Sequence, residues 1–153
     1  MNADPVVMEH FPSSLTPEQS AAMVARIERH LDEEGFGLWA VEVPGTAPFI
    51  GFVGLQRVPF DAGFTPAVEV GWRLDAAHWG RGYATEAARA CLVFGFETAD
   101  LDEIISMTTP GNLRSRRVME RIGMRHDPAD DFDHPRLPEG HPLRRCVLYR
   151  LQR

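Results

Sequence analysis

Apolar residues recur at helical spacing between residues 17 and 34 and predict an amphipathic surface helix. Thr16 is placed to cap this helix, Pro17 suits its first turn, and Gln19 can close a capping box with Thr16. Gly35 marks the expected end of the helix. The apolar positions are Ala21, Met23, Val24, Ile27 and Leu31.

Three segments rich in branched and aromatic residues follow and predict strands. Residues 36–43 and 49–58 flank the turn signal Pro44-Gly45 and should pair as a hairpin. In the third segment, 67–74, side chains alternate between two faces, and Glu69 lies mid-strand with no local partner. One face carries Val68, Val70, Trp72 and Leu74, and the other carries Glu69, Gly71 and Arg73.

The second half of the chain alternates helices and strands. From Ala84 onward, small and apolar residues predict a helix packed closely against a sheet, and residues 103–108 predict the next strand. Asn112 opens a short helix, and residues 127–142 should form a loop before a final strand at 145–151. The helical positions are Ala87, Ala88, Cys91, Leu92, Gly95 and Phe96 in the first helix, and Leu113, Val118, Met119 and Ile122 in the second, with Gly123 as its stop. The elements together indicate an α+β protein.

Length and composition fit one compact domain over residues 1–153. The chain has 153 residues, of which 44% are hydrophobic and 25% are charged. No apolar run approaches the roughly 18 residues that span a bilayer, and residues 1–11 lack the basic start and apolar core of a signal peptide. We therefore expect a cytoplasmic protein that does not bind membranes.

The charged residues exclude several classes of function. A formal charge of −6 argues against a general affinity for nucleic acid, and an acidic surface better suits a cationic substrate. All 16 basic residues other than histidine are arginine. Schiff-base chemistry and a Walker-type phosphate lysine are therefore excluded.

Neither the cysteines nor the histidines show the spacing of metal ligands. Cys91 and Cys146 lie far apart without a Cys-x-x-Cys pair, so we expect two buried thiols and no covalent route through an activated cysteine. Asp133, His134 and His141 are irregularly spaced and separated by prolines. This arrangement matches no ligand pattern, and we expect no metal site.

A glycine-rich turn at residues 79–87 lies between a predicted strand and a predicted helix. Glycines let backbone N–H groups converge, and the helix N-terminus adds partial positive charge, so the turn can cradle an anion; a tight structural turn is the alternative. A dinucleotide fingerprint would need a third glycine where Thr85 stands, and a P-loop would need Gly-Lys-Ser/Thr. The turn reads Trp79-Gly80-Arg81-Gly82-Tyr83-Ala84-Thr85-Glu86-Ala87.

Three ordered motifs resemble the GNAT superfamily of N-acetyltransferases. Residues 79–84 are similar to its Gln/Arg-x-x-Gly-x-Gly/Ala pyrophosphate loop, with tryptophan in the first position. Residues 69–72 and 80–87 resemble the Rim-type (RimJ/RimL-like) branch, which acetylates protein N-termini and other amines, and residues 112–124 resemble its Asn-x-x-Ser helix. Residues 4–8, Asp-Pro-Val-Val-Met, are similar to an early segment of that branch, so the resemblance extends over nearly the whole chain.

The resemblance implies a GNAT fold, with a mixed, mostly antiparallel central sheet flanked by helices. Members of the branch usually begin with a strand and part of a helix ahead of the segment that matches residues 4–8, and we expect this chain to lack them. A missing strand would leave a sheet edge uncovered and part of the acceptor cleft unfinished. An uncovered edge favours a homodimer.

The resemblance also implies that acetyl-CoA is the cosubstrate. Amides of residues 81–85 would bind its pyrophosphate, and the pantetheine arm would lie between the strands 67–74 and 103–108, which diverge in this fold. A backbone N–H near Val70 would hold the thioester oxygen. Asn112 would bond the pantetheine or a water, or serve only as an N-cap. The candidates for cofactor binding are Val70, Trp79, Arg81, Gly82, Tyr83, Ala84, Thr85 and Asn112.

Glu69 and Ser115 are the candidate catalytic residues. An amine must lose its proton before it attacks a thioester, and Glu69 lies where the family often places a general base, between apolar neighbours that could raise its pKa. A solvent-facing residue paired to Arg73 is the alternative. Ser115 lies where Rim-type enzymes place a serine near the sulfur and would protonate the CoA thiolate, or it could only close a local bond with the helix cap.

The predicted activity is transfer of an acetyl group from acetyl-CoA to a primary amine by direct attack. A non-catalytic acyl-CoA-binding or interaction protein with the same fold is the main alternative. The acceptor could be a protein N-terminus, a polyamine or amino acid, or an aminoglycoside-like drug, selected by the loops 59–66 and 127–142. A helix face of Arg114, Arg116, Arg117 and Arg121 could meet the ribose phosphate of CoA or simply be solvated.

Overall fold

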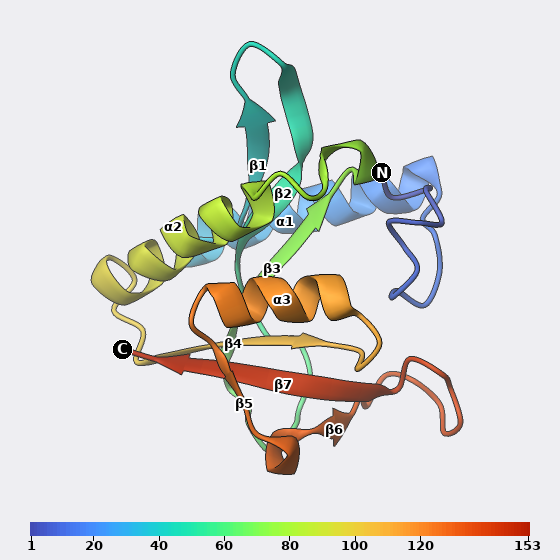
Figure 1. Ribbon diagram of the computed structural model, residues 1–153, viewed down its shortest axis with the longest axis vertical. Coiled ribbons are helices and arrows are strands. Elements are labelled where there is room, and N and C mark those ends of the chain that lie inside the picture. Colours follow the sequence, from blue (N-terminus) through green and yellow to red (C-terminus); the bar gives the residue numbers. More distant parts are fainter.

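The computed structural model describes residues 1–153, which form three α-helices and a seven-stranded sheet (Figure 1). The helices are α1 (Pro17–Glu34), α2 (Tyr83–Glu97) and α3 (Leu113–Arg121), with short 3-10 helices at Ala76–His78 and Pro128–Asp130. The strands are β1 (Leu38–Val43), β2 (Ala47–Arg57), β3 (Val68–Leu74), β4 (Glu103–Thr108), β5 (Arg125–His126), β6 (Phe132–Asp133) and β7 (Arg145–Gln152). Every helix and long strand lies within a few residues of the segment predicted for it.

Local sequence sets both ends of α1. The Thr16 side chain accepts a hydrogen bond from the Gln19 amide at 3.2 Å, and the Thr16 amide donates to the Gln19 side chain at 2.9 Å. These two bonds form the predicted capping box. Gly35 ends the helix in the left-handed conformation, with a φ of 73°. No residue of α1 is buried, so the helix lies on the surface as its sequence pattern predicts.

The sheet has the strand order β1-β2-β3-β4-β7-β5, and β6 pairs with β7 outside this path. All neighbouring strands are antiparallel except β3 and β4, which are parallel. β1 lies at one edge and pairs with β2. The mixed, mostly antiparallel sheet with flanking helices confirms the predicted GNAT fold.

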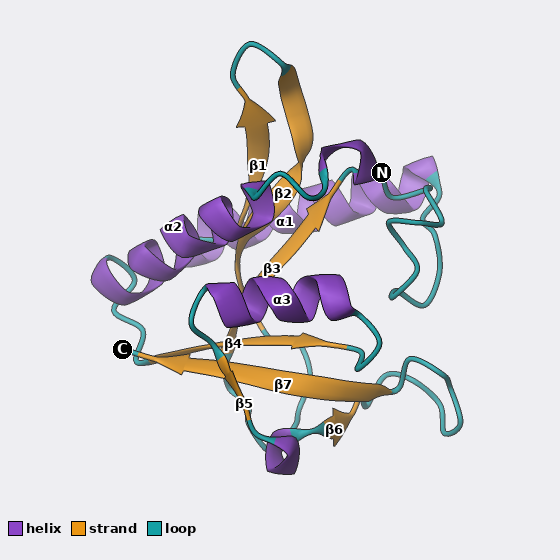
Figure 2. Cartoon of the chain, viewed as in Figure 1, coloured by secondary structure: helices purple, strands orange, loops and turns teal.

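Helices cover both faces of this sheet (Figures 1 and 2). α1 lies behind the sheet in the view of Figure 1, and α2 and α3 lie in front of it. α2 approaches closely because Gly95 has no side chain; an added Cβ there would lie 2.6 Å from Cδ1 of Ile104 on β4. The main core cluster joins α2 and α3 with β2, β3, β4 and β7. None of the helices combines the length and apolar character that crossing a bilayer requires.

β3 and β4 separate soon after they meet. Their one backbone pair joins Glu69 to Ile105, whereas β3 pairs with β2, and β4 with β7, along their whole lengths. The sheet therefore opens beyond Glu69 and Ile105, toward the C-terminal ends of both strands. The divergence expected from the family resemblance is present.

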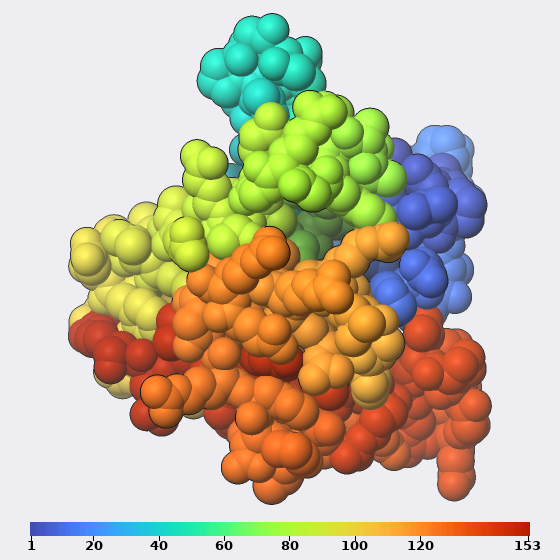
Figure 3. Space-filling model, in the orientation of Figure 1, coloured from blue at the N-terminus to red at the C-terminus, as the bar shows by residue number.

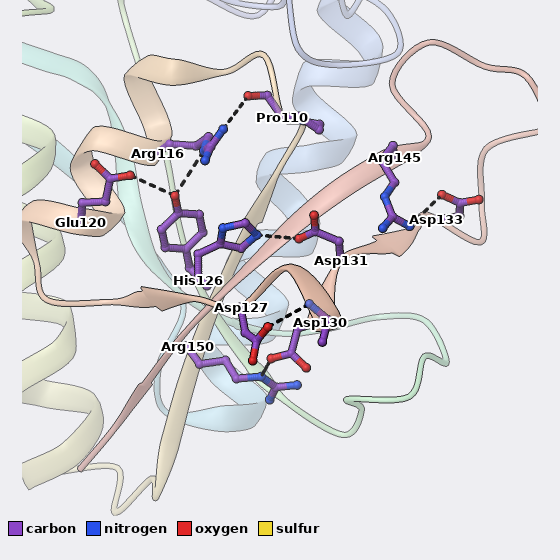
Figure 4. A network of polar contacts seen from close by, with 12 residues as sticks. Pro110, Arg116, Glu120, His126, Asp127, Asp130, Asp131, Asp133, Arg145 and Arg150 are labelled. Atoms are coloured by element: carbon purple, nitrogen blue, oxygen red, sulfur yellow. Dashed lines mark hydrogen bonds and ion pairs between the residues drawn. The ribbon is translucent and has the colours of Figure 1, made fainter.

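Tyr149 on β7 fixes α3 against the sheet through Arg116 and Glu120, which are labelled in Figure 4. Its buried hydroxyl donates to Glu120 Oε1 at 3.0 Å and accepts from Arg116 Nε at 3.2 Å. Arg116 Nη1 also donates to the Pro110 carbonyl at 3.1 Å. These contacts hold both α3 and the turn that precedes it.

The segment expected to be only loop, 127–142, contains a 3-10 helix and β6, and β5 precedes it. β5 and β6 are too short to show a periodic pattern, and side-chain contacts with β7 hold this region (Figure 4). His126 stacks on the ring of Tyr149 and lies 2.7 Å from the Asp131 carboxylate. Arg150 Nε donates to Asp130 at 2.6 Å.

Candidate functional site

The glycine-rich loop presents a row of unpaired backbone amides at the start of α2. Gly80 and Gly82 have φ values of 75° and 88°, which residues with side chains rarely adopt. None of the amides of residues 80 to 85 donates to a protein acceptor, because α2 has no side-chain cap and its backbone ladder begins with Glu86 bonding the Gly82 carbonyl. Free amides at a helix N-terminus are suited to binding an anion. The loop therefore has the free backbone amides that the predicted anion site requires.

Trp79 fastens this loop to the rest of the protein. Its indole Nε1 donates to the Leu74 carbonyl at the end of β3, at 2.8 Å. The guanidinium of Arg114 on α3 lies 4.8 Å from the Trp79 ring centroid. Tyr83 and Ala84 pack against the core. The side chains of the loop thus hold its position, and its backbone amides are left free.

A hollow of about 520 Å³ opens beside the loop, between α2 and α3. Figure 3 shows the residues of α2 (yellow-green) and α3 (orange) facing each other across this region. Arg89 Nη2 donates to the Arg121 carbonyl at 2.9 Å and joins the two helices. Two arginines and free amides border the hollow and favour phosphate, although the acidic residue Glu86 lines it as well. The lining residues are Gly82, Thr85, Glu86, Arg89 and Arg121.

The four arginines of α3 do not act as one basic face. Arg116 is bound to Tyr149 and Pro110, and Arg114 stacks on Trp79. Of the four, Arg121 lines the hollow. Arg89 joins it from α2, and no sequence motif singles this arginine out.

Val70 and Trp72 lie on the edge of β3 that faces the split. Val70 is fully buried, and its carbonyl accepts a hydrogen bond from the Ser106 hydroxyl on β4 at 2.8 Å. The peptide group of Val70 therefore points toward β4. Because peptide direction alternates along a strand, the next amide to face the split is that of Trp72. This second amide lies beyond the backbone pair of Glu69 with Ile105.

Asn112 and Ser115 lie at the start of α3, next to β3. The Asn112 side chain accepts from the Ser115 amide at 3.2 Å and donates to Thr108 Oγ1 at 2.9 Å, so Asn112 is an N-cap. The Ser115 hydroxyl accepts from Trp72 Nε1 at 3.3 Å. Since an indole N–H can only donate, the hydroxyl hydrogen of Ser115 remains available for donation.

Glu69 lies on the opposite face of β3 from Val70. Gln56 Nε2 donates to its carboxylate at 3.2 Å, and the Met107 backbone also bonds it. Burial raises the pKa of Glu69 to about 7, and these two bonds lower it only in part. No cation pairs with the carboxylate, and Arg73 in particular does not. Glu69 keeps partial exposure to solvent, so a ligand can reach it.

The two loops expected to select the acceptor lie together. The closest ring pair, Phe60 and His134, has centroids 4.6 Å apart, and Arg136 donates to the Pro59 carbonyl. The rings of this aromatic cluster are Phe60 and Phe64 from one loop and Phe132 and His134 from the other.

Cys91 and Cys146 are free, buried thiols, as predicted. Burial raises the pKa of each to about 11, so both stay protonated near neutral pH. The His, Cys, Asp and Glu side chains form no group of three or more that could hold a metal ion.

Comparison with known proteins identifies the family of this chain. Residues 1–125 match the family described as an acetyltransferase (GNAT) domain. The chain belongs to the GNAT acetyltransferases. This GNAT acetyltransferase is 36% identical over 123 residues to the uncharacterized protein YkkB of Bacillus subtilis, a match that covers 80% of this chain and 70% of YkkB.

Other similar proteins agree with that assignment. FsC-acetyl coenzyme A-N(2)-transacetylase of Aspergillus fumigatus is 36% identical over 96 residues, which cover 60% of this chain and 40% of that protein. The crystal structure of a GNAT-family acetyltransferase from Bacillus anthracis matches with a TM-score of 0.78 at 27% identity, covering 99% of this chain and 84% of that one. These matches support an N-acetyltransferase.

Membership of the Rim-type branch is a finer prediction. Mycobacterium smegmatis RimJ, in complex with CoA-disulfide, matches with a TM-score of 0.69 and 18% identity, covering 88% of this chain and 61% of RimJ. A likeness at that identity shows the shared fold. The superfamily is therefore established for this GNAT acetyltransferase, and its branch stays a prediction.

Sequence reasoning missed the hydrogen-bond partners of both catalytic candidates. Gln56 lies directly opposite Glu69 in the pairing of β2 with β3, so a correct register would have found it. Trp72 and Ser115 are 43 positions apart on different elements, and no local pattern connects them.

Proposed function

We propose that this protein transfers the acetyl group of acetyl-CoA to a primary amine, which attacks the thioester directly. The observation that carries this proposal is Glu69, a carboxyl with a pKa of about 7 at the point where β3 and β4 separate. A general base works best when its pKa lies near the working pH. Glu69 meets this condition through burial.

Acetyl-CoA fits the groups on the opposite side of the split. The amides of residues 81–85, with that of Gly80, suit a pyrophosphate, and Arg89 and Arg121 suit the ribose phosphate. The opening between β3 and β4 suits the extended pantetheine arm. Trp79 fixes the loop, and Asn112 fixes the helix that borders the arm. When bound, acetyl-CoA supplies the activated acetyl group.

Glu69 would accept the proton of the incoming ammonium, through a water. The freed amine attacks the thioester carbon, and negative charge develops on the carbonyl oxygen. A backbone N–H on the facing edge of β3, at Val70 or next at Trp72, would stabilise this oxygen by roughly 3 kcal/mol. The Val70 amide lies at the backbone pair of Glu69 with Ile105, whereas the Trp72 amide faces the opening beyond that pair, which favours Trp72.

As the tetrahedral intermediate collapses, Ser115 would donate its hydrogen to the departing thiolate and take the second proton of the attacking nitrogen, so that the amide forms and the hydroxyl is regenerated. Its hydroxyl already accepts the indole N–H of Trp72, so its own hydrogen is free for this step. Trp72 acts here as a positioning residue. Glu69 lies on one face of β3 and Ser115 approaches from the other. Deprotonation of the ammonium and protonation of the thiolate would therefore occur on opposite faces of the strand.

The Rim-type branch and a single domain over residues 1–153 are part of the same proposal. The motifs at 69–72, 80–87 and 112–124 support the branch. The main core cluster, which extends from Phe36 to Tyr149, supports the single domain.

Calorimetric titration of the purified chain with acetyl-CoA, with NAD as control, tests the cofactor. A thiol-release assay across a panel of amines then tests turnover. We expect binding of acetyl-CoA, no binding of NAD, and CoA release that depends on the amine. Binding without release from any amine would favour a non-catalytic acyl-CoA-binding protein, and absence of binding would contradict the cofactor assignment.

A further inference from the structure

Arg73 on β3 is a cation without a counter-ion. Its Nη1 donates to Asn2 Oδ1 at 3.0 Å and to the Met23 sulfur at 3.7 Å. The guanidinium lies 4.1 Å from the ring centroid of Phe11 and 5.4 Å from that of Phe52. None of these partners is anionic, and Nε of Arg73 is buried with no hydrogen bond.

This environment is costly for the protein alone. Burial lowers the pKa of Arg73 to about 10, and no acidic group counteracts that shift. A partly buried cation is normally paired. Arg150 shows the usual arrangement, with Asp130 at 2.6 Å and Glu103 at 2.9 Å. The chain has 22 acidic residues, yet none pairs with Arg73.

The surface between Arg73 and Glu69 is open. Side chains alternate along β3, so Glu69, Gly71 and Arg73 share one face, and all three keep partial exposure to solvent. A Cβ added at Gly71 would meet nothing within 4 Å. Glycine inside a strand often marks a place where a ligand approaches the backbone. The face therefore has the Glu69 carboxyl at one end and the Arg73 guanidinium, without a counter-ion, at the other. Between them lies Gly71, which has no side chain.

We propose that Arg73 binds an anionic group of the acceptor, and that the acceptor is therefore an amine that also carries a carboxylate. This inference rests on the proposed function, with the amine at Glu69. Four strand residues span about 13 Å between the Cα atoms of Glu69 and Arg73, a separation that the two side chains and a small amino acid between them can bridge. A guanidinium can bind a carboxylate through two parallel hydrogen bonds. A polyamine would place a second cation near Arg73 and is disfavoured.

The test compares acceptors that differ only in the carboxylate. Straight-chain amino acids of increasing length are assayed beside their primary amides and beside diamines of similar length, with acetyl-CoA saturating. We expect kcat/KM for the best acid to exceed that of its amide by about tenfold to a hundredfold, because a charge-assisted bond is lost in the amide. Arg73→Gln should remove this preference mainly by raising KM for the acids.

Arg57→Gln is the matched control. It removes the same charge, but Arg57 already pairs with Glu34 at 2.7 Å, so the preference for acids should remain. Gly71→Val is a second test that leaves Arg73 intact. The added side chain enters open space in a strand, where valine is favoured, so the fold should persist while acids lose affinity.

A binding measurement removes the dependence on turnover. The CoA-loaded protein is titrated with straight-chain carboxylates that have no amine, and binding should weaken about tenfold or more in Arg73→Gln. Equal binding by wild type and variant, or no preference for acid over amide, overturns the proposal. An equal loss for every acceptor in Arg73→Gln also overturns it, because Arg73 would then only hold residues 1–11. Carboxylate binding that depends on Arg73, without acetylation of any amine, would keep the anion site and reject the proposed function.

Discussion

The two sides of the split between β3 and β4 are built from different chemical groups. On the cofactor side, one short loop supplies consecutive backbone amides, and the side chain of Trp79 only holds that loop in place. On the proposed acceptor side, Glu69 and Arg73 of β3 and Gln56 of β2 supply single side chains. A site made of backbone depends on the shape of the chain. A site made of side chains depends on the identity of each one, so single substitutions should have their largest effects there.

Glu69→Gln should give the largest effect. The amide cannot accept the proton, and kcat should fall by about 10² to 10⁴ while the Kd for acetyl-CoA stays unchanged. In the wild type only ionised Glu69 is active, and its pKa is about 7. Activity should therefore fall as pH drops through 7, by about tenfold per unit below it. Steady-state assays between acidic and mildly basic pH measure both quantities.

Glu42→Gln is the control for that substitution. It replaces the same carboxylate by the same amide, but on the exposed edge strand β1. It should leave the rate and the pH profile as they are. A Glu69→Gln protein with the rate and pH profile of the wild type would show that another group removes the proton.

Gly82→Ala should give the next largest effect, on the cofactor side. Gly82 has a φ of 88°, and a residue with a Cβ in a left-handed conformation costs roughly 1 to 2 kcal/mol. The strained loop would misplace its amides, and the Kd for acetyl-CoA should rise about tenfold. Calorimetric titration measures the change.

Gly45→Ala places the same strain in the β1–β2 turn, where φ is 72°, away from both sides of the split. It should lower the melting temperature without changing the Kd for acetyl-CoA. If both variants bind acetyl-CoA equally well, the glycine loop is not the phosphate site.

Ser115→Ala should give the smallest effect. A free thiol has a pKa of about 8.5, so a thiolate leaves with little help at neutral pH, and kcat should fall about tenfold or less. Trp72→Phe keeps the aromatic ring and removes the N–H that orients Ser115, so it should change kcat in the same direction. The acetyl-CoA Kd should stay constant in both. A rate equal to that of the wild type in Ser115→Ala would remove this serine from the mechanism.

Features carried by neighbouring residues could be predicted from the sequence. The capping box of Thr16 with Gln19 and the turn at Gly82 depend on contacts within a few positions, and both are present. The β5 and β6 strands have two residues each and form through contacts with β7, so no periodic pattern marks them. The bond from Trp72 to Ser115 likewise exists only after the chain has folded.

Net charge describes the whole surface and does not specify the charges of the proposed acceptor face. A charge of −6 suggested a cationic substrate. Yet salt screens distant charges, and groups within a few ångströms determine the local potential. Near Glu69 that potential is set by a carboxyl without a cation, and farther along the strand by Arg73 without an anion.

The single backbone pair of β3 with β4 also affects how the two parts of the sheet are held together. Rows of backbone hydrogen bonds join β1 to β3 into one plate and β4 to β7 into another. Between the two plates, the sheet has the backbone pair at Glu69 and Ile105 and the bond from the Ser106 hydroxyl to the Val70 carbonyl. Backbone pairing in the sheet is therefore sparsest along this line. Glu69 belongs to the first plate and Ser115 is carried by a helix fixed to the second through Tyr149. The bond from Trp72 to Ser115 and the shared core cluster cross this line, so side chains, more than backbone pairing, hold the proposed base and the proposed acid in place relative to each other.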